Sequence, residues 1–201
     1  QDRIIGSDVI ILPGERKNIS AFCVERGRWS AGETGSKFSG YSNAVSQNVR
    51  KAAVVNKNQS EVWSNVSQIN SRNKIRSNTN AYTALEDSKE YKYKMQKYLS
   101  EFESAWDNDQ SVVGIIAVSG NRVLGCDIFA THAIFRNAYN NLLHAYLTEA
   151  ISNGSEVTRT LDQENSYLKK LLSDESRQEE YLKDKGDIFK YNNRKLHISV
   201  F

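Results

Sequence analysis

Short hydrophobic stretches of the kind that form β-strands occur in three parts of the chain. Residues 4–12 are rich in isoleucine and valine and end at a Pro-Gly turn signal, so residues 18–26 are predicted to return as the second strand of a hairpin. Residues 112–118 and 123–129 flank the compact turn sequence Ser-Gly-Asn-Arg and predict a central hairpin. A last hairpin is predicted around the Asn-Asn pair close to the end of the chain. Connections this short imply antiparallel pairing.

Between the first two hairpins the apolar residues change to a helical spacing. This spacing predicts helices over residues 45–56 and 62–69, the second opened by the capping-type sequence Asn-Gln-Ser-Glu. Trp63 falls in the second helix and is expected to lie in the core or at a helix–sheet contact. A longer helix is predicted over residues 86–106, where aromatic and aliphatic side chains form a continuous stripe.

The same spacing returns after the central hairpin. It predicts a helix over residues 133–151 that ends near an Asn-Gly pair. Thr160 with Gln163 has the form of a capping box and begins a charged helical region that extends to about Lys185. The order is therefore strands, helices, strands, helices and strands. It predicts an α+β fold, with an antiparallel sheet built from several hairpins and helices inserted between them.

The length and composition of the chain are typical of one soluble globular domain. The chain has 201 residues, which we assign to a single α+β domain over residues 1–201. Hydrophobic residues make up 39% of the sequence, and no apolar run approaches the roughly 20 residues needed to cross a bilayer. No membrane span is therefore predicted.

The charge balance argues against a dedicated nucleic-acid-binding protein. Twenty-seven basic residues are spread among 24 acidic ones, giving a net charge of only +3. Residues 48–76 are locally basic, with six arginines and lysines against Glu61. A solvated helical face is the favoured interpretation of this region, and a surface that binds an anion is the alternative.

Cysteine and histidine usage favours neither a disulfide framework nor a metal site. Cys23 and Cys126 are expected to be buried thiols in a reducing compartment, which favours the cytoplasm. Export remains the alternative because the chain begins with Gln1 instead of methionine. The three histidines are His132, His144 and His197, and no metal-ligand spacing connects them. We therefore predict neither a metal nor a cofactor.

Candidate chemistry gathers where the first predicted hairpin opens. Folding residues 4–12 against residues 18–26 brings the N-terminal residues beside the segment that begins at Glu25. A carboxylate at the edge of an apolar strand face needs a partner, and Arg3 and Arg28 are the nearby candidates. Two interpretations remain open: the cluster closes the end of a sheet, or it forms a ligand site.

In the ligand-site interpretation, each side chain has a role that suits its chemistry. Arg3 and Arg28 would hold an anion such as phosphate, with Gln1 beside them. Trp29 would stack on a planar group, and Glu25 would orient the ligand or act as a general base. The glycine- and serine-rich residues 30–43 that follow are predicted to be a mobile loop in the position of a lid.

These residues also carry a resemblance to a known family. A Q-x-R segment and a C-x-E-x-G-R-W segment, separated by a strand pair, resemble the bacterial ARPP-1 family, a domain of unknown function. The matching positions are Gln1, Arg3, Cys23, Glu25, Gly27, Arg28 and Trp29. The central hairpin and the terminal sequence LHISVF are similar to later segments of that family. Since sheet-forming sequence usually precedes the Q-x-R segment there, the resemblance leaves open whether strands upstream of residue 1 belong to this domain.

The family is named after its association with ADP-ribosylglycohydrolase and rhodanese-phosphatase proteins. The resemblance therefore implies a phosphorylated small molecule, related to a nucleotide or to ADP-ribose, as the ligand to be bound or processed. The alternative is a non-catalytic structural or protein-interaction module, in which the Arg/Glu/Trp cluster only closes the sheet. The sequence does not decide whether the domain is an enzyme.

Overall fold

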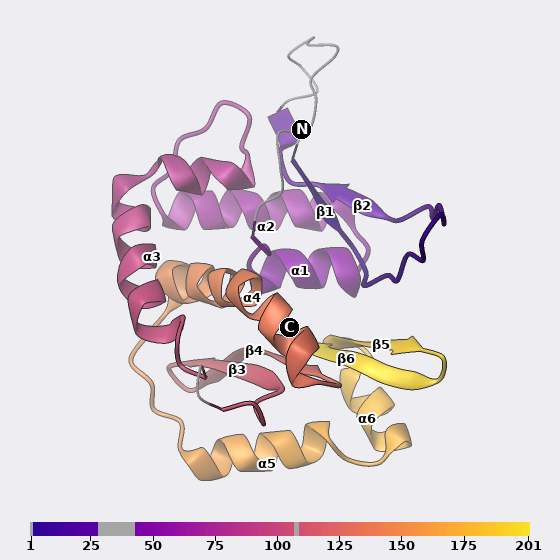
Figure 1. Cartoon of the computed structure of the whole chain (residues 1–201). Coiled ribbons are helices and arrows are strands. Elements are labelled where there is room, and N and C mark those ends of the chain that lie inside the picture. Colours follow the sequence, from indigo (N-terminus) through magenta and orange to yellow (C-terminus); the bar gives the residue numbers. More distant parts are fainter. Residues whose placement is uncertain (1, 28–42, 107–108) are drawn as a thin grey trace.

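A four-stranded antiparallel sheet with helices on both faces forms the centre of the molecule, which was obtained as a computed structural model (Figure 1). The structure describes residues 2–27, 43–106 and 109–201. A separate two-stranded hairpin lies at the opposite end of the helical layer from the sheet. The predicted α+β class is confirmed, although the strands divide into two sheets instead of joining one.

The central and C-terminal hairpins pair edge to edge in the order β3-β4-β6-β5. Their strands are β3 (Gly114–Ser119), β4 (Arg122–Phe129), β5 (Gly186–Tyr191) and β6 (Arg194–Val200). Both predicted hairpins are therefore confirmed. Asn192 and Asn193, with φ of 47° and 58°, form the turn between β5 and β6. Asparagine tolerates this left-handed conformation, which a tight hairpin turn requires.

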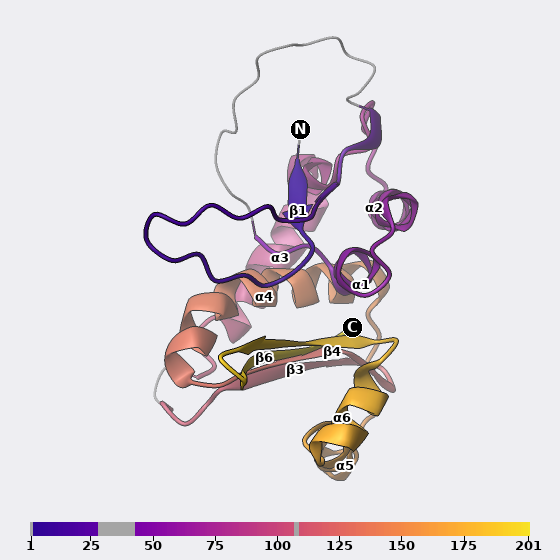
Figure 2. The same ribbon diagram turned by 90° about the vertical axis from the view of Figure 1, so that its right-hand side faces the viewer.

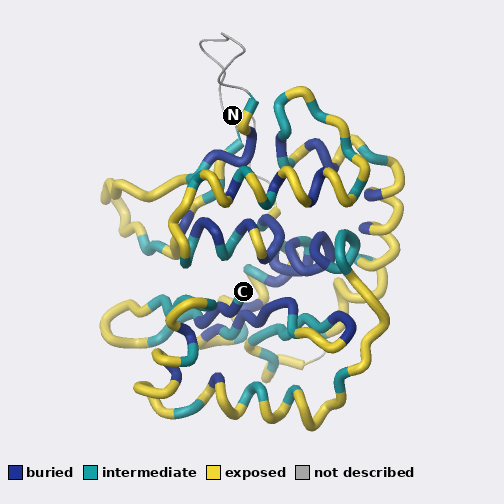
Figure 3. Tube along the Cα trace, turned by 180° about the vertical axis from the view of Figure 1, so that it is seen from behind, coloured by how far each residue is buried: buried dark blue, intermediate teal, exposed yellow. Residues whose placement is uncertain are grey.

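One face of the sheet packs against the main helical layer (Figure 2). This layer consists of α1 (Gln47–Val54), α2 (Gln59–Arg72), the 3-10 helix η2 (Tyr82–Asp87), α3 (Lys89–Phe102) and α4 (His132–Asn153). The capping sequence predicted before α2 is present, because the Asn58 side chain accepts hydrogen bonds from the backbone of Ser60 and Glu61. Helix α4 lies across the sheet, and its buried residues are concentrated in its C-terminal half, at residues 142–149 (Figure 3).

Two shorter helices cover the opposite face of the sheet. The charged region predicted to extend to Lys185 divides into α5 (Leu161–Leu171) and α6 (Glu175–Leu182). The predicted capping box of Thr160 and Gln163 opens α5. These helices enclose a second, smaller core, whose buried members are Cys126, Leu171, Leu182, Ile198 and Val200. Among the described residues, no helix is long and apolar enough to cross a membrane.

The first predicted hairpin is present as an antiparallel pair, but the predicted length of its strands is the main error of the sequence-based fold. Only β1 (Arg3–Ile5) and β2 (Ala21–Cys23) are strands, and residues 6–20, here called the β1–β2 excursion, have no regular structure (Figure 3). Ile11 and Leu12 in this excursion are more than half exposed. Isoleucine and valine favour strands because they pack on a half-buried sheet surface, and here no such surface covers them.

Candidate functional site

The pairing of β1 with β2 brings the chain start to the segment that carries the predicted motif. Arg3 lies opposite Cys23, and the Val24 amide donates a 3.0 Å hydrogen bond to the carbonyl of Asp2. Gln59, at the start of α2, holds Cys23 by hydrogen bonds of 2.8 Å to both its amide and its carbonyl. The strand end is thus fixed to the helical layer.

The segment after β2 is fixed just as firmly to the chain that precedes η2. Glu25 forms an antiparallel bridge with Ala81, and the Gly27 amide donates a 2.7 Å hydrogen bond to the Thr79 carbonyl. A Cβ atom on Gly27 would lie 2.7 Å from the Thr79 Cα, a distance that only glycine avoids. The glycine of the motif therefore permits a close approach between two backbone segments.

The predicted site residues are only partly within the structure. Glu25 is buried, with 6% of its surface exposed, and Arg3 is exposed at the same end of the hairpin. Gln1, Arg28 and Trp29 lie outside the described residues, as does the predicted loop over residues 30–43. The ligand-binding and catalytic roles of these residues stay predictions.

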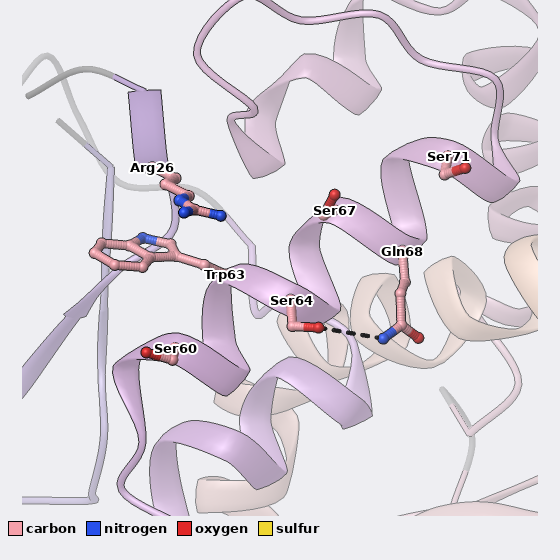
Figure 4. A pocket seen from close by; sticks show the side chains of 7 residues that line it. All are labelled: Arg26, Ser60, Trp63, Ser64, Ser67, Gln68 and Ser71. Carbon is pink, nitrogen blue, oxygen red and sulfur yellow. Dashed lines mark hydrogen bonds between the residues drawn. The ribbon is translucent and has the colours of Figure 1, made fainter. Parts of the chain in front are cut away.

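A groove of about 490 Å³ opens next to the motif, between Arg26 and the outer face of α2 (Figure 4). We call it the Trp63 groove. It is lined by Arg26, Ser60, Trp63, Ser64, Ser67, Gln68 and Ser71. The Arg26 guanidinium carbon lies 5.9 Å from the centre of the Trp63 ring, within the range of a cation–π contact.

Hydroxyl groups follow the groove along α2. Ser60, Ser64, Ser67 and Ser71 recur at the spacing of one helix face, opposite the buried face of that helix. Gln68 donates a hydrogen bond of 3.4 Å to the Ser64 hydroxyl (Figure 4). The indole N–H of Trp63 is buried, and no described residue accepts its hydrogen bond. Buried donors usually have a partner, and the indole N–H of Trp106 is a second one that no described residue satisfies.

A second polar cluster, the buried charge network, lies between the helical layer and the sheet. Arg50 of α1 donates two hydrogen bonds, 2.9 and 2.8 Å long, to the two oxygens of Asp127 in β4. The Tyr146 hydroxyl of α4 donates a third, 2.5 Å long. Nε2 of His197 in β6 lies 2.8 Å from the same carboxylate. These four side chains, Arg50, Asp127, Tyr146 and His197, make up the network.

The comparison with known families covers both clusters. The model of the ARG and Rhodanese-Phosphatase-superfamily-associated Protein domain, ARPP-1, matches residues 1–199 of the 201-residue chain. The chain belongs to the ARPP-1 family. Searches of the curated proteins and of the solved structures found no match. The family is therefore shown by sequence, whereas no relative of known structure or activity assigns a role to either cluster.

In this ARPP-1 domain, the pKa values of two members of the buried charge network are strongly shifted. Burial alone would raise the pKa of Asp127, but the charge of Arg50 and the hydrogen bonds from Arg50 and His197 hold that pKa well below its usual range. Burial would likewise lower the pKa of His197, yet hydrogen bonds to Asp127 and Asp8 raise it to about 9. At neutral pH, His197 is therefore a charged imidazolium between two carboxylates.

Sequence reasoning missed Arg26, the Trp63 groove and the whole network. Trp63 was expected in the core or at a helix–sheet contact; it is half-buried, faces Arg26 and lines the groove. The serine spacing along α2 could have indicated a polar face beside it. Asp127, an aspartate within an apolar strand, could have indicated a buried and partnered charge. Arg50 lies 77 residues away in sequence, so that partner could not be identified.

Within the described residues, no three His, Cys, Asp or Glu side chains are arranged to hold a metal ion.

Proposed function

We propose that this ARPP-1 domain binds a phosphorylated small molecule with a planar group, such as a nucleotide or an ADP-ribose-like compound, in the Trp63 groove. The observation that carries the proposal is the position of Arg26. Its guanidinium lies over an indole at an open groove, and Arg26 itself lies within the motif segment, between Glu25 and Gly27. No reaction is assigned to the site.

Three kinds of group in the groove suit such a ligand. The indole of Trp63 offers a face for stacking at the open groove. Arg26 offers a planar cation that can hold a phosphate oxygen pair. The serine hydroxyls along α2 can donate to and accept from the hydroxyls of a sugar. The association recorded in the family name, with ARG and rhodanese-phosphatase proteins, supports the same ligand class.

The sequence-predicted residues enter the proposal as the neighbouring part of the same site. Arg3 lies on the strand beside the motif, and we propose that Gln1, Arg3, Arg28 and Trp29 extend the contacts to the ligand from there. Glu25 is buried and bridged to Ala81, a position that suits a group that orients its neighbours. We therefore propose for Glu25 the orienting role, and the general-base role stays a sequence prediction.

One observation favours a second candidate function, a structural or protein-interaction module. Glu25 is 6% exposed, and its segment is fixed by backbone hydrogen bonds at Val24 and Gly27. A buried motif of this kind can stabilise a fold without binding anything. In this alternative, the motif closes the end of the hairpin and the Trp63 groove is an ordinary surface.

The proposal is tested by thermal denaturation with and without millimolar ADP-ribose. A ligand present at 100 times its dissociation constant stabilises the native state by about 2.7 kcal/mol, which corresponds to several degrees in a domain of this size. We expect such a rise for the wild type. We expect no rise for Trp63→Ala or Arg26→Ala, because each removes one half of the stacked pair.

Arg136→Ala is the matched control, because Arg136 is an exposed arginine on α4, outside the groove. It should keep the full ligand response. Glu25→Gln separates the two candidate functions. A large fall in its melting temperature, with no ligand response in the wild type at any concentration tested, would favour the structural module and reject the proposed ligand class.

A further inference from the structure

Within the described residues, one side chain carries the hydrogen bond between the β1–β2 excursion and the sheet. Inside the excursion, Lys17 donates to the Ile10 carbonyl (2.8 Å), and the Glu15 carboxylate accepts from the Leu12 amide (2.9 Å). Nδ1 of His197 lies 2.5 Å from the Asp8 carboxylate. Among the hydrogen bonds of the described residues, this is the one that joins residues 7–19 to the rest of the molecule.

His197 is placed to act through both of its ring nitrogens. Nε2 faces Asp127, which has no exposed side-chain surface, and Nδ1 faces Asp8, whose side chain is 48% exposed. The ring stacks on Phe129, with centres 4.2 Å apart and planes 9° from parallel. Its orientation is therefore fixed from the sheet side, and only the Asp8 side is open to change.

Charged and titratable groups from several helices and strands influence the protonation state of the His197 ring. The groups that act on His197 directly or through its two carboxylate partners are Asp127 (β4), Asp8 (excursion), Asp187 (β5), Arg50 (α1), Tyr146 (α4) and Lys57, which follows α1. Burial and the nearby charge of Asp8 raise the pKa of Asp187. Carboxylates therefore dominate the immediate surroundings of the imidazole.

We propose that the Asp8–His197–Asp127 bridge is a pH-sensitive latch that holds the β1–β2 excursion against the four-stranded sheet. A protonated imidazole donates one hydrogen bond to each carboxylate. The neutral ring keeps one N–H only. We expect the fully buried Asp127 to retain it, because the Asp8 side chain is 48% exposed and can accept from water instead. The lone pair on Nδ1 then faces the Asp8 carboxylate, and the repulsion releases Asp8 and the excursion with it.

The latch also bounds a cleft. Ser7 and Asp8 form one wall of a cleft of about 590 Å³, and β5 with α6 forms the other through residues that include Asp187 and Lys190. Release of Asp8 would therefore widen this cleft as well as free the excursion. The inference uses none of the residues of the Trp63 groove, so it stands or falls independently of the proposed ligand.

Nuclear magnetic resonance tests the latch on the whole chain. At pH 7, we expect backbone order parameters of about 0.85 for residues 8–12 in the wild type and below about 0.6 in Asp8→Ala. Glu15→Ala is the control, because it removes a contact within the excursion and leaves Asp8 in place. Residues 8–10 should stay ordered in that variant. Unchanged order in Asp8→Ala would overturn the proposal.

A titration supplies the second readout. The His197 ring should titrate near pH 9 in the wild type, and the methyl signals of Ile10 and Ile11 should move with the same midpoint. In Asp8→Ala, the ring should titrate lower but still above 6.5, because Asp127 remains in contact, and the methyl signals should no longer respond. If Asp8→Ala does not fold, Asp8→Asn replaces it in the titration. Its amide accepts from the charged ring and donates to the neutral ring, so the methyl signals should again not follow the ring titration. Methyl signals that ignore the ring titration in the folded wild type would reject the latch.

Discussion

The Trp63 groove and the buried charge network each contain an arginine, but the two arginines differ in their partners and in their exposure to solvent. Arg26 lies over an indole at an open surface. Arg50 makes two short hydrogen bonds to Asp127, a carboxylate with no exposed surface. The first arginine is exposed at the groove that we propose as a ligand site, and the second has its donors committed within the fold.

This difference separates stability from binding. A charge pair that has been removed from water depends on both partners, and loss of either leaves an uncompensated buried charge. An exposed cation is already solvated, so its loss changes the folded state little. If the contrast between the two clusters is correct, substitutions in the network should act on folding, and substitutions in the groove should act on binding.

The largest expected effect is that of Arg50→Ala. This substitution leaves the Asp127 carboxylate buried without its bidentate partner and also removes the contact of the guanidinium with the Phe201 ring, whose centre is 4.8 Å away. We expect the free energy of unfolding to fall by about 3–5 kcal/mol. Urea denaturation followed by circular dichroism measures it.

The double substitution Arg50→Ala with Asp127→Asn serves as the control. It removes the charge that Arg50→Ala strands, so part of the lost stability should return. A loss below about 1 kcal/mol for Arg50→Ala alone would mean that Asp127 does not depend on this partner, and the contrast between the two clusters would fail.

The next effect is a pH dependence carried by His197. Its pKa in the folded state is raised to about 9, above the value of about 6.5 of an unperturbed histidine. The stabilisation that His197 contributes to the folded state is therefore complete below pH 6.5 and is lost as the pH rises through 9. Since one pH unit corresponds to about 1.4 kcal/mol, the loss should approach roughly 3 kcal/mol.

Urea denaturation between pH 6 and pH 10 checks this slope, with His197→Gln as the matched variant. The variant lacks the titrating ring, so its unfolding free energy should change much less over the same interval. Equal slopes in the two proteins would show that other groups carry the pH dependence and that the His197 bridge contributes little.

The parts of the fold that could be predicted from sequence are those fixed by local chemistry. The Asn192–Asn193 turn and the Thr160 cap depend on residues within a few positions of each other, and both are present. The strand predicted through Ile11 failed because strand preference needs a packing surface that the sequence does not reveal.

The same difference between local and long-range contacts explains which of the polar clusters could be predicted from the sequence. The motif was visible because its residues are close in sequence and one short hairpin pairs Arg3 with Cys23, whereas the network joins four elements. Asp127 stands out in the sequence as an aspartate within an apolar strand, but nothing local identifies Arg50, 77 residues away, as its partner. Only the tertiary fold brings the two side chains together.

The smallest expected effect on stability is that of Arg26→Ala. Arg26 is exposed, and a cation–π contact at an exposed site contributes roughly 0.5–1 kcal/mol at most. We therefore expect its unfolding free energy to fall by less than about 1 kcal/mol, several-fold less than for Arg50→Ala under the same conditions. The comparison is sharp because both substitutions delete the same side chain, so helix propensity or charge count alone cannot account for a large difference. A loss for Arg26→Ala as large as that for Arg50→Ala would place Arg26 in the structural framework, and the Trp63 groove would then be a closed part of the fold instead of a surface kept ready for a ligand.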